Sequence, residues 1–536
     1  MKIEGLPRNT STHAAGIIMT KEDLVTYTPL DEGLNDIYQT QYEAVDLEKL
    51  GLLKNDFLGL RNLTNIKNCL DSIKKENPNF VMPKDYNDPK TFKMIASGET
   101  TGVFQLESAG MRKVLRDLKV SSFDDITSAI ALYRPGPMDI IPTFIKRKFK
   151  EEIVTYPHPD LEPILKNTYG TIVYQDQIML IAWRFAGYSL GQADILRRAV
   201  SKKKKEILEA ERINFVSSSV KKGYTKETAE EIYDYIVKFA NYGFNKAHSV
   251  AYAVVAYETA YLKANYPEHY FSSLMSSISG SDTMMSEYIN EARKQNIKIC
   301  SPNITISTDI FVSKNHQIIY PLTGIMGLGL VKATEILKER EKGEFKDFED
   351  FVVRTKIIIS ASLLENIIYS GALDCFKKTK KSMIENYQSI LNKNQYAFIN
   401  QLELLETAYD VEEYPYGYLL EKEKEVLGLN IKYNFMFQYQ NLYLNKELQK
   451  IIDVKNSSYA KVLGVIKKVK EVKTSNSELM AFCTVYDDSD SIDITLFPKH
   501  FEKYPNLSVG QVYAICGKVE KRKNQLQIVV DSMRLI

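Results

Sequence analysis

The chain has 536 residues, with 70 Lys and Arg against 68 Asp and Glu and a formal net charge of +2. At roughly 150 residues per domain, this length predicts three or four domains, each able to bury its own core. The near-neutral balance excludes nucleic-acid binding through bulk charge, so any such binding must come from local clusters of basic residues.

Membrane, secreted and zinc-binding classes find no support in the sequence. It has no long apolar run and no signal pattern after Met1, so we expect a cytoplasmic protein without a membrane partner. The five cysteines lie far apart, and the chain has no C-x-x-C pair. Their odd number and spacing argue against a disulfide framework or a zinc site, so we expect reduced core thiols.

An apolar stretch from Gly51 to Thr64, GLLKNDFLGLRNLT, contains one Lys and one Asp. As a buried strand, it would place Lys54 and Asp56 on one face, because strand side chains alternate with a period of two. An ammonium beside a carboxylate is costly to desolvate unless the two pair or bind an ion. The spacing therefore indicates a site with a metal or phosphate nearby, with a structural ion pair as the alternative.

The same stretch resembles the palm of the C-family bacterial replicative DNA polymerases, the DNA polymerase III alpha subunits, in which K-x-D-F-L-G-L-R carries the last of three catalytic carboxylates. Six further long motifs follow the family order. These motifs are GLPRNTSTHAAGIIM (Gly5–Met19), TTGVFQLESAGMR (Thr100–Arg112), ALYRPGPMD (Ala131–Asp139), YGTIVYQDQIM (Tyr169–Met179), ADILRRAVSKKK (Ala193–Lys204) and YGFNKAHSVAYAVVAYETAYLKANYP (Tyr242–Pro267). The resemblance implies that Asp56 holds Mg²⁺ and that Lys54 lies beside the triphosphate of the incoming deoxynucleotide.

Two-metal nucleotidyl transfer needs several carboxylates, because one Asp cannot hold two divalent ions about 3.5 to 4 Å apart. In the family, an earlier Asp-x-Asp strand supplies the other two, and here nothing precedes Met1. By the same comparison, the metallophosphatase-like domain, the Gly-rich triphosphate loop and most of the thumb are missing. We therefore expect the C-terminal half of a polymerase, unable to polymerise alone, whose Mg²⁺ site is completed by residues outside this chain.

Changes of pattern along the chain, read together with the resemblance, predict a multi-domain α+β fold. The expected parts are the C-terminal part of a polymerase-beta-like palm (1–62), mainly helical fingers (63–317), a tandem helix-hairpin-helix (318–376), a connector (377–455) and a C-terminal β-barrel of the OB-fold type (456–536).

In the fingers, GQADILRRAVSKKKKEILEAERINF predicts one helix that opens after Gly191. Asp194 lies three and four residues before Arg197 and Arg198, a spacing at which a carboxylate orients a guanidinium. Phosphate is a natural counter-ion for this concentration of positive charge, although a solvated surface helix remains the alternative for the lysines. The resemblance implies that the two arginines contact the incoming triphosphate.

A second finger helix is predicted within Tyr242–Lys263, after Gly243 and Asn245. Its first turn holds Lys246 and His248, and exposed backbone N–H groups there favour an anion such as a nucleotide phosphate. We expect the later tyrosines of the helix to pack in the core. By the resemblance, His248 lies against the sugar of the incoming nucleotide and excludes ribose by crowding the 2′ position.

The segment ALYRPGPMDIIPTFIKRKFK joins a turn stiffened by prolines to a basic stretch. We expect Lys146, Arg147 and Lys148 to form a basic edge along the phosphate backbone of template or duplex DNA, since such binding is electrostatic and independent of sequence. A plain exposed loop is the alternative.

Farther along, GIMGLGLVKATEIL has Gly327 and Gly329 on either side of Leu328. We expect a tight turn between two helices, in which backbone amides can approach a DNA phosphate. With Ala333 and the later segment SGALDCF, it resembles the tandem helix-hairpin-helix of the family, whose expected role is to grip duplex DNA.

The connector contains QLELL, which resembles the short peptide by which polymerases hold the sliding clamp. Gln401, Leu404 and Leu405 would fill a pocket on that partner, with Leu405 standing where Phe is usual. An amphipathic helix with no such role is the alternative, because short motifs match by chance.

From Tyr459 onward, a period of two predicts strands of a small closed barrel, and the resemblance implies an OB-fold. Such folds bind single strands by stacking bases on aromatic rings along a basic groove. Lys467 and Lys468 could line the groove, with Phe482 and Tyr486 as stacking platforms. We expect the acidic turn DDSDSID to be a solvated loop.

Two functions stay open at this point. In the first, the chain is part of a replicative DNA polymerase that acts on primer-template DNA and deoxynucleoside triphosphates, with the clamp and other replisome subunits as partners. In the second, it is a non-catalytic DNA- and clamp-binding fragment from a split or truncated gene. A helix-hairpin-helix repair enzyme is a distant third, because it would not need the GFNKAH or RPGP segments.

Overall fold

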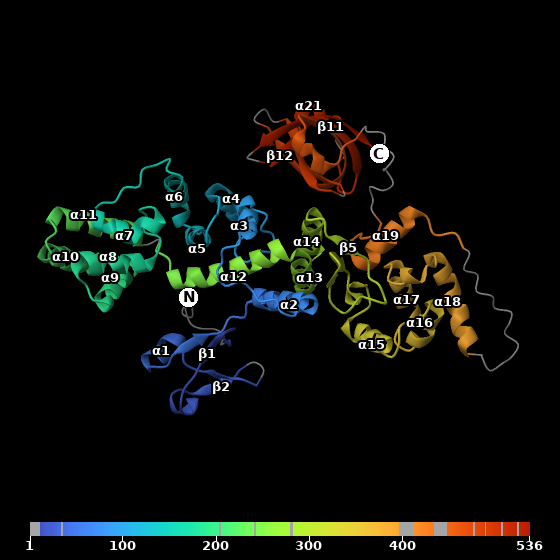
Figure 1. Cartoon of the computed structure of the whole chain (residues 1–536), viewed down its shortest axis with the longest axis horizontal. Helices are drawn as coiled ribbons and strands as arrows, with labels where there is room; N and C mark the ends of the chain where they lie inside the picture. Colours follow the sequence, from blue (N-terminus) through green and yellow to red (C-terminus); the bar gives the residue numbers. More distant parts are fainter. Residues whose placement is uncertain are drawn as a thin grey trace, which may run out of the picture. The chain divides into compact units, whose positions relative to one another are not determined.

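The computed structural model describes residues 11–33, 36–202, 205–240, 243–278, 282–395, 411–433, 448–474, 478–487, 489–504, 507–522 and 525–536. The chain divides into two compact units, Met1–Thr64 and Asn65–Ile536. Helices dominate most of the second unit, and its C-terminal end forms a closed barrel (Figure 1). The predicted mixed α+β class is confirmed.

The first unit is built from short antiparallel strand pairs. β1 (Gly16–Ile18) pairs with β4 (Lys54–Asp56), which sets Gly16 opposite Asp56 and Ile18 opposite Lys54. β2 (Leu30–Glu32) pairs with β3 (Tyr38–Thr40). The short helices of this unit are η1 (Leu24–Thr26) and α1 (Ala44–Lys49).

The prediction of a buried strand over Gly51–Thr64 is wrong. Only the three residues of β4 are extended, Leu53 and Phe57 on either side of them are exposed, and helix α2 (Arg61–Glu76) already begins at Arg61. Lys54 and Asp56 do share a face, as the period of two predicts, but that face is open to solvent. The cost of desolvation therefore gives no reason to expect an ion there.

In the second unit, the long helix α12 (Lys246–Asn265) packs against α3 (Pro89–Ser97) and α5 (Phe123–Leu132) (Figure 1). It begins where the sequence predicts, because the Asn245 side chain accepts a hydrogen bond from the N–H of His248 and so caps the first turn. Tyr257 is buried among the rings of Phe92 and Phe123, as expected for the tyrosines of this helix.

Near its C-terminal end, α12 carries a fully buried lysine. The Lys263 ammonium donates to the carbonyl oxygens of Glu99 at 2.8 Å and Thr101 at 2.9 Å. Burial lowers the pKa of Lys263 to about 8, since desolvation disfavours the charged form. These two hydrogen bonds link the loop after α3 to the C-terminal end of α12.

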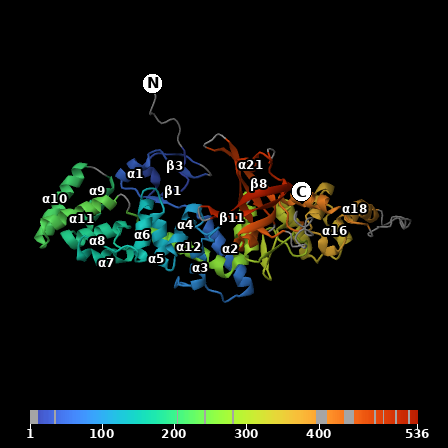
Figure 2. The same cartoon turned by 90° about the horizontal axis from the view of Figure 1, so that it is seen from above.

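A separate helical bundle lies in the fingers and comprises α8 (Gln175–Ala186), α9 (Leu190–Lys202), α10 (Lys205–Lys221) and α11 (Lys226–Ala240) (Figure 2). The prediction of one helix from Gly191 through the lysine run is wrong, because α9 and α10 are separate. Both pack on α8. A straight helix over Leu190–Lys221 would be about 48 Å long. Its two halves could not both pack against α8, which has only 12 residues.

The remaining helices of the second unit are α4 (Ala109–Leu118), η2 (Pro137–Ile140), α6 (Ile141–Lys148), η3 (Pro159–Leu161), α7 (Glu162–Leu165), η4 (Lys166–Thr168), α13 (Pro267–Ser277), α14 (Asp282–Lys294), η5 (Leu322–Gly324), α15 (Leu330–Glu341), α16 (Phe348–Thr355), α17 (Ala361–Tyr369), η6 (Asp374–Phe376), α18 (Lys380–Gln395), α19 (Tyr416–Leu427), η8 (Ile451–Asn456) and α21 (Pro498–Phe501). A small sheet has the order β5 (Lys298–Cys300), β7 (Gln317–Ile319), β6 (Val312–Lys314).

The C-terminal barrel closes in the order β10 (Ser491–Leu496), β12 (Gln525–Leu535), β11 (Val512–Arg522), β8 (Tyr459–Lys473), β9 (Leu479–Tyr486). Its interior is apolar, and the long strand β8 bends at a bulge between Ile466 and Lys468. The predicted barrel is confirmed. The acidic turn is less solvated than expected, because Asp487 is buried and accepts hydrogen bonds from the backbone N–H groups of Ile451 and Ser489.

Candidate functional site

The predicted carboxylate and ammonium of the first unit lie in contact on β4, which pairs with β1. The Lys54 Nζ atom is 3.0 Å from the Asp56 Oδ1 atom, and the Asp56 side chain keeps 50% of its surface exposed. The same ammonium lies 3.3 Å from the Nε2 atom of His13. The site is therefore a three-residue cluster with an accessible carboxylate rather than a buried pair.

His13 and Gly16 were not predicted as site residues, although both belong to a motif that carries the family resemblance. The His13 Nδ1 atom accepts hydrogen bonds from the backbone N–H groups of Ala15 at 3.1 Å and Gly16 at 2.7 Å. A Cβ atom on Gly16 would come within 2.4 Å of the Lys54 Cε atom. The only signal in the sequence was one His three residues before a Gly, which is too weak to identify a site.

As a ligand for a divalent ion, the cluster is incomplete. No group of three or more His, Cys, Asp or Glu side chains that could hold a metal occurs among the described residues. Mg²⁺ prefers six oxygen ligands, several of which are usually water or substrate phosphate oxygens. The exposed Asp56 carboxylate is suited to be one protein ligand of such an ion. Other groups would have to supply the remaining ligands.

The predicted arginines of the fingers are held by one carboxylate, as the spacing indicates. Arg197 Nη2 lies 2.7 Å from Asp194 Oδ1, and Arg198 Nε lies 2.8 Å from Asp194 Oδ2. Hydrogen bonding from Arg197 and the two guanidinium charges keep the pKa of Asp194 below its ordinary value. Arg198 is mostly exposed, so its outer nitrogen atoms stay accessible to a phosphate group.

Hydrogen bonds bring the start of α8 beside the start of α12. The Gln175 side chain accepts from Arg197 Nη1 at 3.0 Å, and the Gln175 backbone N–H donates to the Phe244 carbonyl at 2.9 Å. Two residues on, Lys246 lies over the ring of Tyr174. Arg197 and Lys246, which lie far apart in the sequence, therefore belong to one face of the fingers.

His248 lies on the same first turn of α12, exposed to solvent. Its ring stacks on Tyr252, with centroids 4.1 Å apart, and meets the edge of Phe244 at 5.5 Å. Arg134 covers Phe244 on the other side of this aromatic cluster. The imidazole therefore lies in contact with two aromatic rings.

Two of the three residues of the predicted basic edge on α6 have partners within the protein, so their contact with DNA stays a prediction. Lys148 turns inward and forms an ion pair of 2.7 Å with the buried Asp125. Arg147 pairs with Glu152 and donates to the Tyr169 carbonyl. Both cations are used to hold neighbouring segments together, and of the three only Lys146 is exposed.

The glycine turn before α15 has the geometry that a close approach of the backbone requires. Gly327 has a φ of +82°, in the left-handed region that favours glycine, and Gly329 is the N-cap of α15. Leu328 between them is 1% exposed and anchors the turn in the core. The element before the turn is the single-turn helix η5, not the full helix predicted. η5 ends at Gly324, and glycine disfavours the continuation of a helix.

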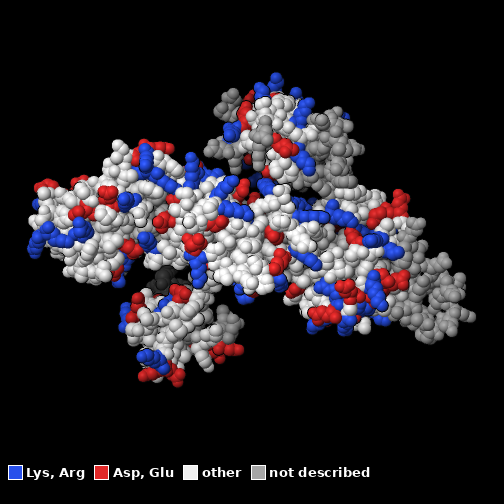
Figure 3. All heavy atoms as spheres, viewed as in Figure 1, with Lys and Arg blue, Asp and Glu red and all other residues white. Residues whose placement is uncertain are grey.

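On the barrel, Lys467 and Lys468 are exposed at the bulge of β8. On the neighbouring strand β9, Phe482 is covered by the Arg522 guanidinium at 4.4 Å, while Tyr486 is 41% exposed. These residues have the chemistry of a single-strand binding surface. On the face shown in Figure 3, basic side chains are interspersed with acidic ones over most of the surface.

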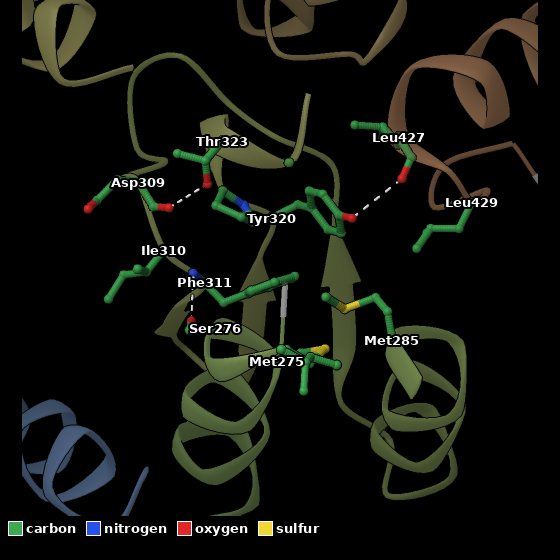
Figure 4. Close-up of a pocket in the computed structure, with 13 residues that line it drawn as sticks. Met275, Ser276, Met285, Asp309, Ile310, Phe311, Tyr320, Thr323, Leu427 and Leu429 are labelled. Carbon is green, nitrogen blue, oxygen red and sulfur yellow. Dashed lines mark hydrogen bonds between the residues drawn. The ribbon is translucent and has the colours of Figure 1, made fainter. Parts of the chain in front are cut away.

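Two other candidates remain, a peptide of the connector and a cavity. The predicted clamp peptide with Gln401, Leu404 and Leu405 lies outside the described residues. A cavity of about 280 Å³ opens between α13, the loop before β6 and the end of α19 (Figure 4). Two of its polar side chains have partners within the protein, since Tyr320 donates to the Leu427 carbonyl and Thr323 donates to the Asp309 carbonyl.

Comparison with known proteins decides the family. The sequence is 41% identical to the DNA polymerase III subunit alpha of Bacillus subtilis (strain 168), across 100% of this chain and 49% of that protein. The subunit of Staphylococcus epidermidis (strain ATCC 12228 / FDA PCI 1200) is 41% identical, and that of Staphylococcus aureus (strain COL) is 40% identical, each covered over 51% of its length. This chain is therefore similar over its whole length to bacterial DNA polymerase III alpha subunits. It spans about half the length of these relatives and matches their C-terminal half.

Separate families of domains match along the chain of this alpha-subunit homologue. Residues 1–59 match the bacterial DNA polymerase III alpha NTPase domain and residues 62–223 the finger domain of the same subunit. Residues 296–383 match a helix-hairpin-helix motif and residues 460–536 an OB-fold nucleic acid binding domain. The predicted order of parts agrees with these matches, while the predicted boundaries stay predictions.

Proposed function

We propose that this chain forms part of a DNA-directed DNA polymerase that adds deoxynucleotides to a primer 3′ end. The accessible carboxylate of Asp56, with Lys54 in contact, carries the proposal, because a carboxylate and a cation at this spacing suit a metal-bound triphosphate. The relatives named DNA polymerase III subunit alpha support it. The proposed site of action is the cytoplasm, where bacterial DNA is replicated.

In this mechanism, Asp56 supplies one carboxylate ligand to Mg²⁺. An ion held there would supply charge neutralisation at the transferring phosphoryl group. Lys54 contributes a positive charge beside the triphosphate. On the fingers, we propose that Arg197, Arg198 and Lys246 bind phosphate groups of the nucleotide through their side-chain donors.

Exposed apolar side chains on the first unit support a catalytic centre completed by further polypeptide. Among its described residues, Leu53, Leu58, Val25 and Tyr38 are each more than 60% exposed, while Leu47 and Leu52 are among its few buried apolar residues. Its short strands also leave backbone edges unpaired. Such surface usually marks an interface, so we propose that more palm strands and two more catalytic carboxylates join here.

For the nucleic-acid partner, we propose that the helix-hairpin-helix and the barrel bind DNA in different ways. The exposed turn at Gly327 and Gly329 suits a phosphate of duplex DNA, because α15 directs its first backbone N–H groups outward there. Lys467, Lys468 and the exposed Tyr486 suit a single template strand through charge and stacking. Lys146 remains a candidate for the DNA backbone. The sliding clamp and other replisome subunits complete the proposed partners.

A non-catalytic role in binding DNA is the second candidate, favoured by the incomplete metal site among the described residues. Template-dependent primer extension separates the two. Full-length enzyme, made by joining this chain to the N-terminal half of its family, should extend a primer with Mg²⁺. Binding of primer-template DNA without extension by that enzyme would support the non-catalytic role.

Sugar selection by His248 gives a first prediction. Replacing His248 by Ala in the full-length enzyme should raise the ratio of ribonucleotide to deoxyribonucleotide incorporation by about tenfold or more, since the imidazole no longer crowds the 2′ position. The measurement is kcat/KM for matched rNTP and dNTP. Tyr252→Phe is the control, because it keeps the ring against which His248 stacks. An unchanged ratio in His248→Ala would discard this role.

A further inference from the structure

The hydrogen bonds around His13 fix which ring nitrogen carries the proton. The Nδ1 atom accepts from two backbone N–H groups, those of Ala15 and Gly16, so it must be unprotonated. In the neutral ring, the proton then lies on the Nε2 atom. His13 therefore presents an N–H donor, and not an acceptor, at its exposed tip.

That donor faces a second donor. The Nε2 atom lies 3.3 Å from the Lys54 ammonium, which is in an ion pair with Asp56 and so is charged. Neither group can accept a hydrogen bond from the other. Two convergent N–H donors at this distance can share one anionic oxygen placed about 2.8 Å from each, the usual length of a charge-assisted hydrogen bond.

The strand geometry keeps the two donors close. Gly16 lies on β1 opposite Asp56 on β4, and a Cβ atom at Gly16 would meet Lys54 Cε at 2.4 Å and His13 Nδ1 at 2.9 Å. Any larger residue would push the histidine and the lysine apart. The absence of a side chain at Gly16 therefore allows the histidine and the lysine to lie close together.

We propose that His13 and Lys54 together bind a phosphate oxygen of the triphosphate of the incoming nucleotide, with His13 as a binding residue that had no assigned role. This inference rests on the proposed polymerase function. The bound oxygen belongs to a triphosphate rather than to DNA, because the Asp56 carboxylate in the same cluster repels a bare phosphodiester, while a metal-bound triphosphate carries the cation that offsets it.

The test uses His13→Asn and His13→Gln in the full-length enzyme. Asparagine can still accept the two backbone N–H groups through its Oδ1 atom but lacks the distal donor, whereas glutamine extends an N–H to the distal position. We expect His13→Asn to raise the KM for dNTP about tenfold with kcat within twofold of wild type, and His13→Gln to recover part of the loss. The KM for pyrophosphate in the reverse reaction should rise in parallel.

The outcomes separate this inference from the proposed function. If wild-type enzyme extends primers but His13→Asn keeps the wild-type KM for dNTP, the histidine only supports the turn and the inference is overturned. The same conclusion holds if His13→Asn lowers kcat alone. If wild-type enzyme binds primer-template DNA without extending it, the proposed function itself fails. Circular dichroism and thermal melting verify that each variant still folds. Gly16→Ala should also raise the KM for dNTP, because its Cβ atom would displace Lys54 and His13.

Discussion

Replacing Asp56 by Asn in the full-length enzyme should lower kcat for primer extension by about a thousandfold or more. An amide keeps the shape of the side chain but removes the negative charge that holds the metal ion. Charge stabilisation by a catalytic metal amounts to several kcal/mol, and about 4 kcal/mol corresponds to a factor of a thousand in rate. Steady-state extension of a primer on a synthetic template, with saturating dNTP and Mg²⁺, measures the effect.

A matched control for Asp56→Asn is Asp46→Asn. Asp46 is also an exposed aspartate of the first unit and also pairs with a lysine, Lys49, at 2.9 Å. This variant should retain the wild-type rate, because an exposed ion pair of this kind contributes little to stability or function. Copying of DNA at the wild-type rate by Asp56→Asn would show that this carboxylate is not a metal ligand.

The largest expected loss of stability comes from Asp125→Ala in the fingers. Asp125 is buried, forms an ion pair of 2.7 Å with Lys148, and accepts from the backbone N–H groups of Ser121 and Ser122 at the start of α5. Its removal leaves the Lys148 ammonium without its carboxylate partner, although the ammonium still donates to the Leu118 carbonyl. We expect the free energy of unfolding of the fingers to fall by about 3–5 kcal/mol, the usual cost of leaving a buried charge uncompensated.

The reverse change, Lys148→Met, should cost less, because Asp125 keeps its backbone donors and methionine fills similar space. Proteolysis in increasing urea, with cleavage followed within the fingers, measures both variants without assuming that all domains unfold together. Equal losses for the two substitutions would show that the ion pair, and not the burial of an uncompensated charge, determines the effect.

Local patterns predicted much of this fold. The Asn245 cap and the regular spacing of small and aromatic residues identify α12, and the alternation after Tyr459 identifies the barrel. The pairing of Asp194 with two arginines also follows from sequence, since residues three and four apart on a helix face one another. These features depend on contacts between near neighbours, so the sequence contains the information that decides them.

Features that depend on distant contacts were missed. Whether Lys148 points outward depends on Asp125, which lies on another helix, and a basic stretch alone does not show that this partner exists. The break between α9 and α10 arises because both must pack on α8. The contact of His13 with Lys54 depends on the pairing of β1 with β4, two strands separated by 35 residues of sequence, so local patterns do not predict it.

Primer extension by separated and joined halves tests the central claim most directly. Three samples are compared on the same primer-template with Mg²⁺ and dNTP. The samples are this chain alone, the N-terminal half of a related alpha subunit alone, and the two joined in one polypeptide. The account predicts template-dependent extension by the joined protein and none by either half. Extension by this chain alone, or no extension by a joined protein that is folded and binds primer-template DNA, would contradict it.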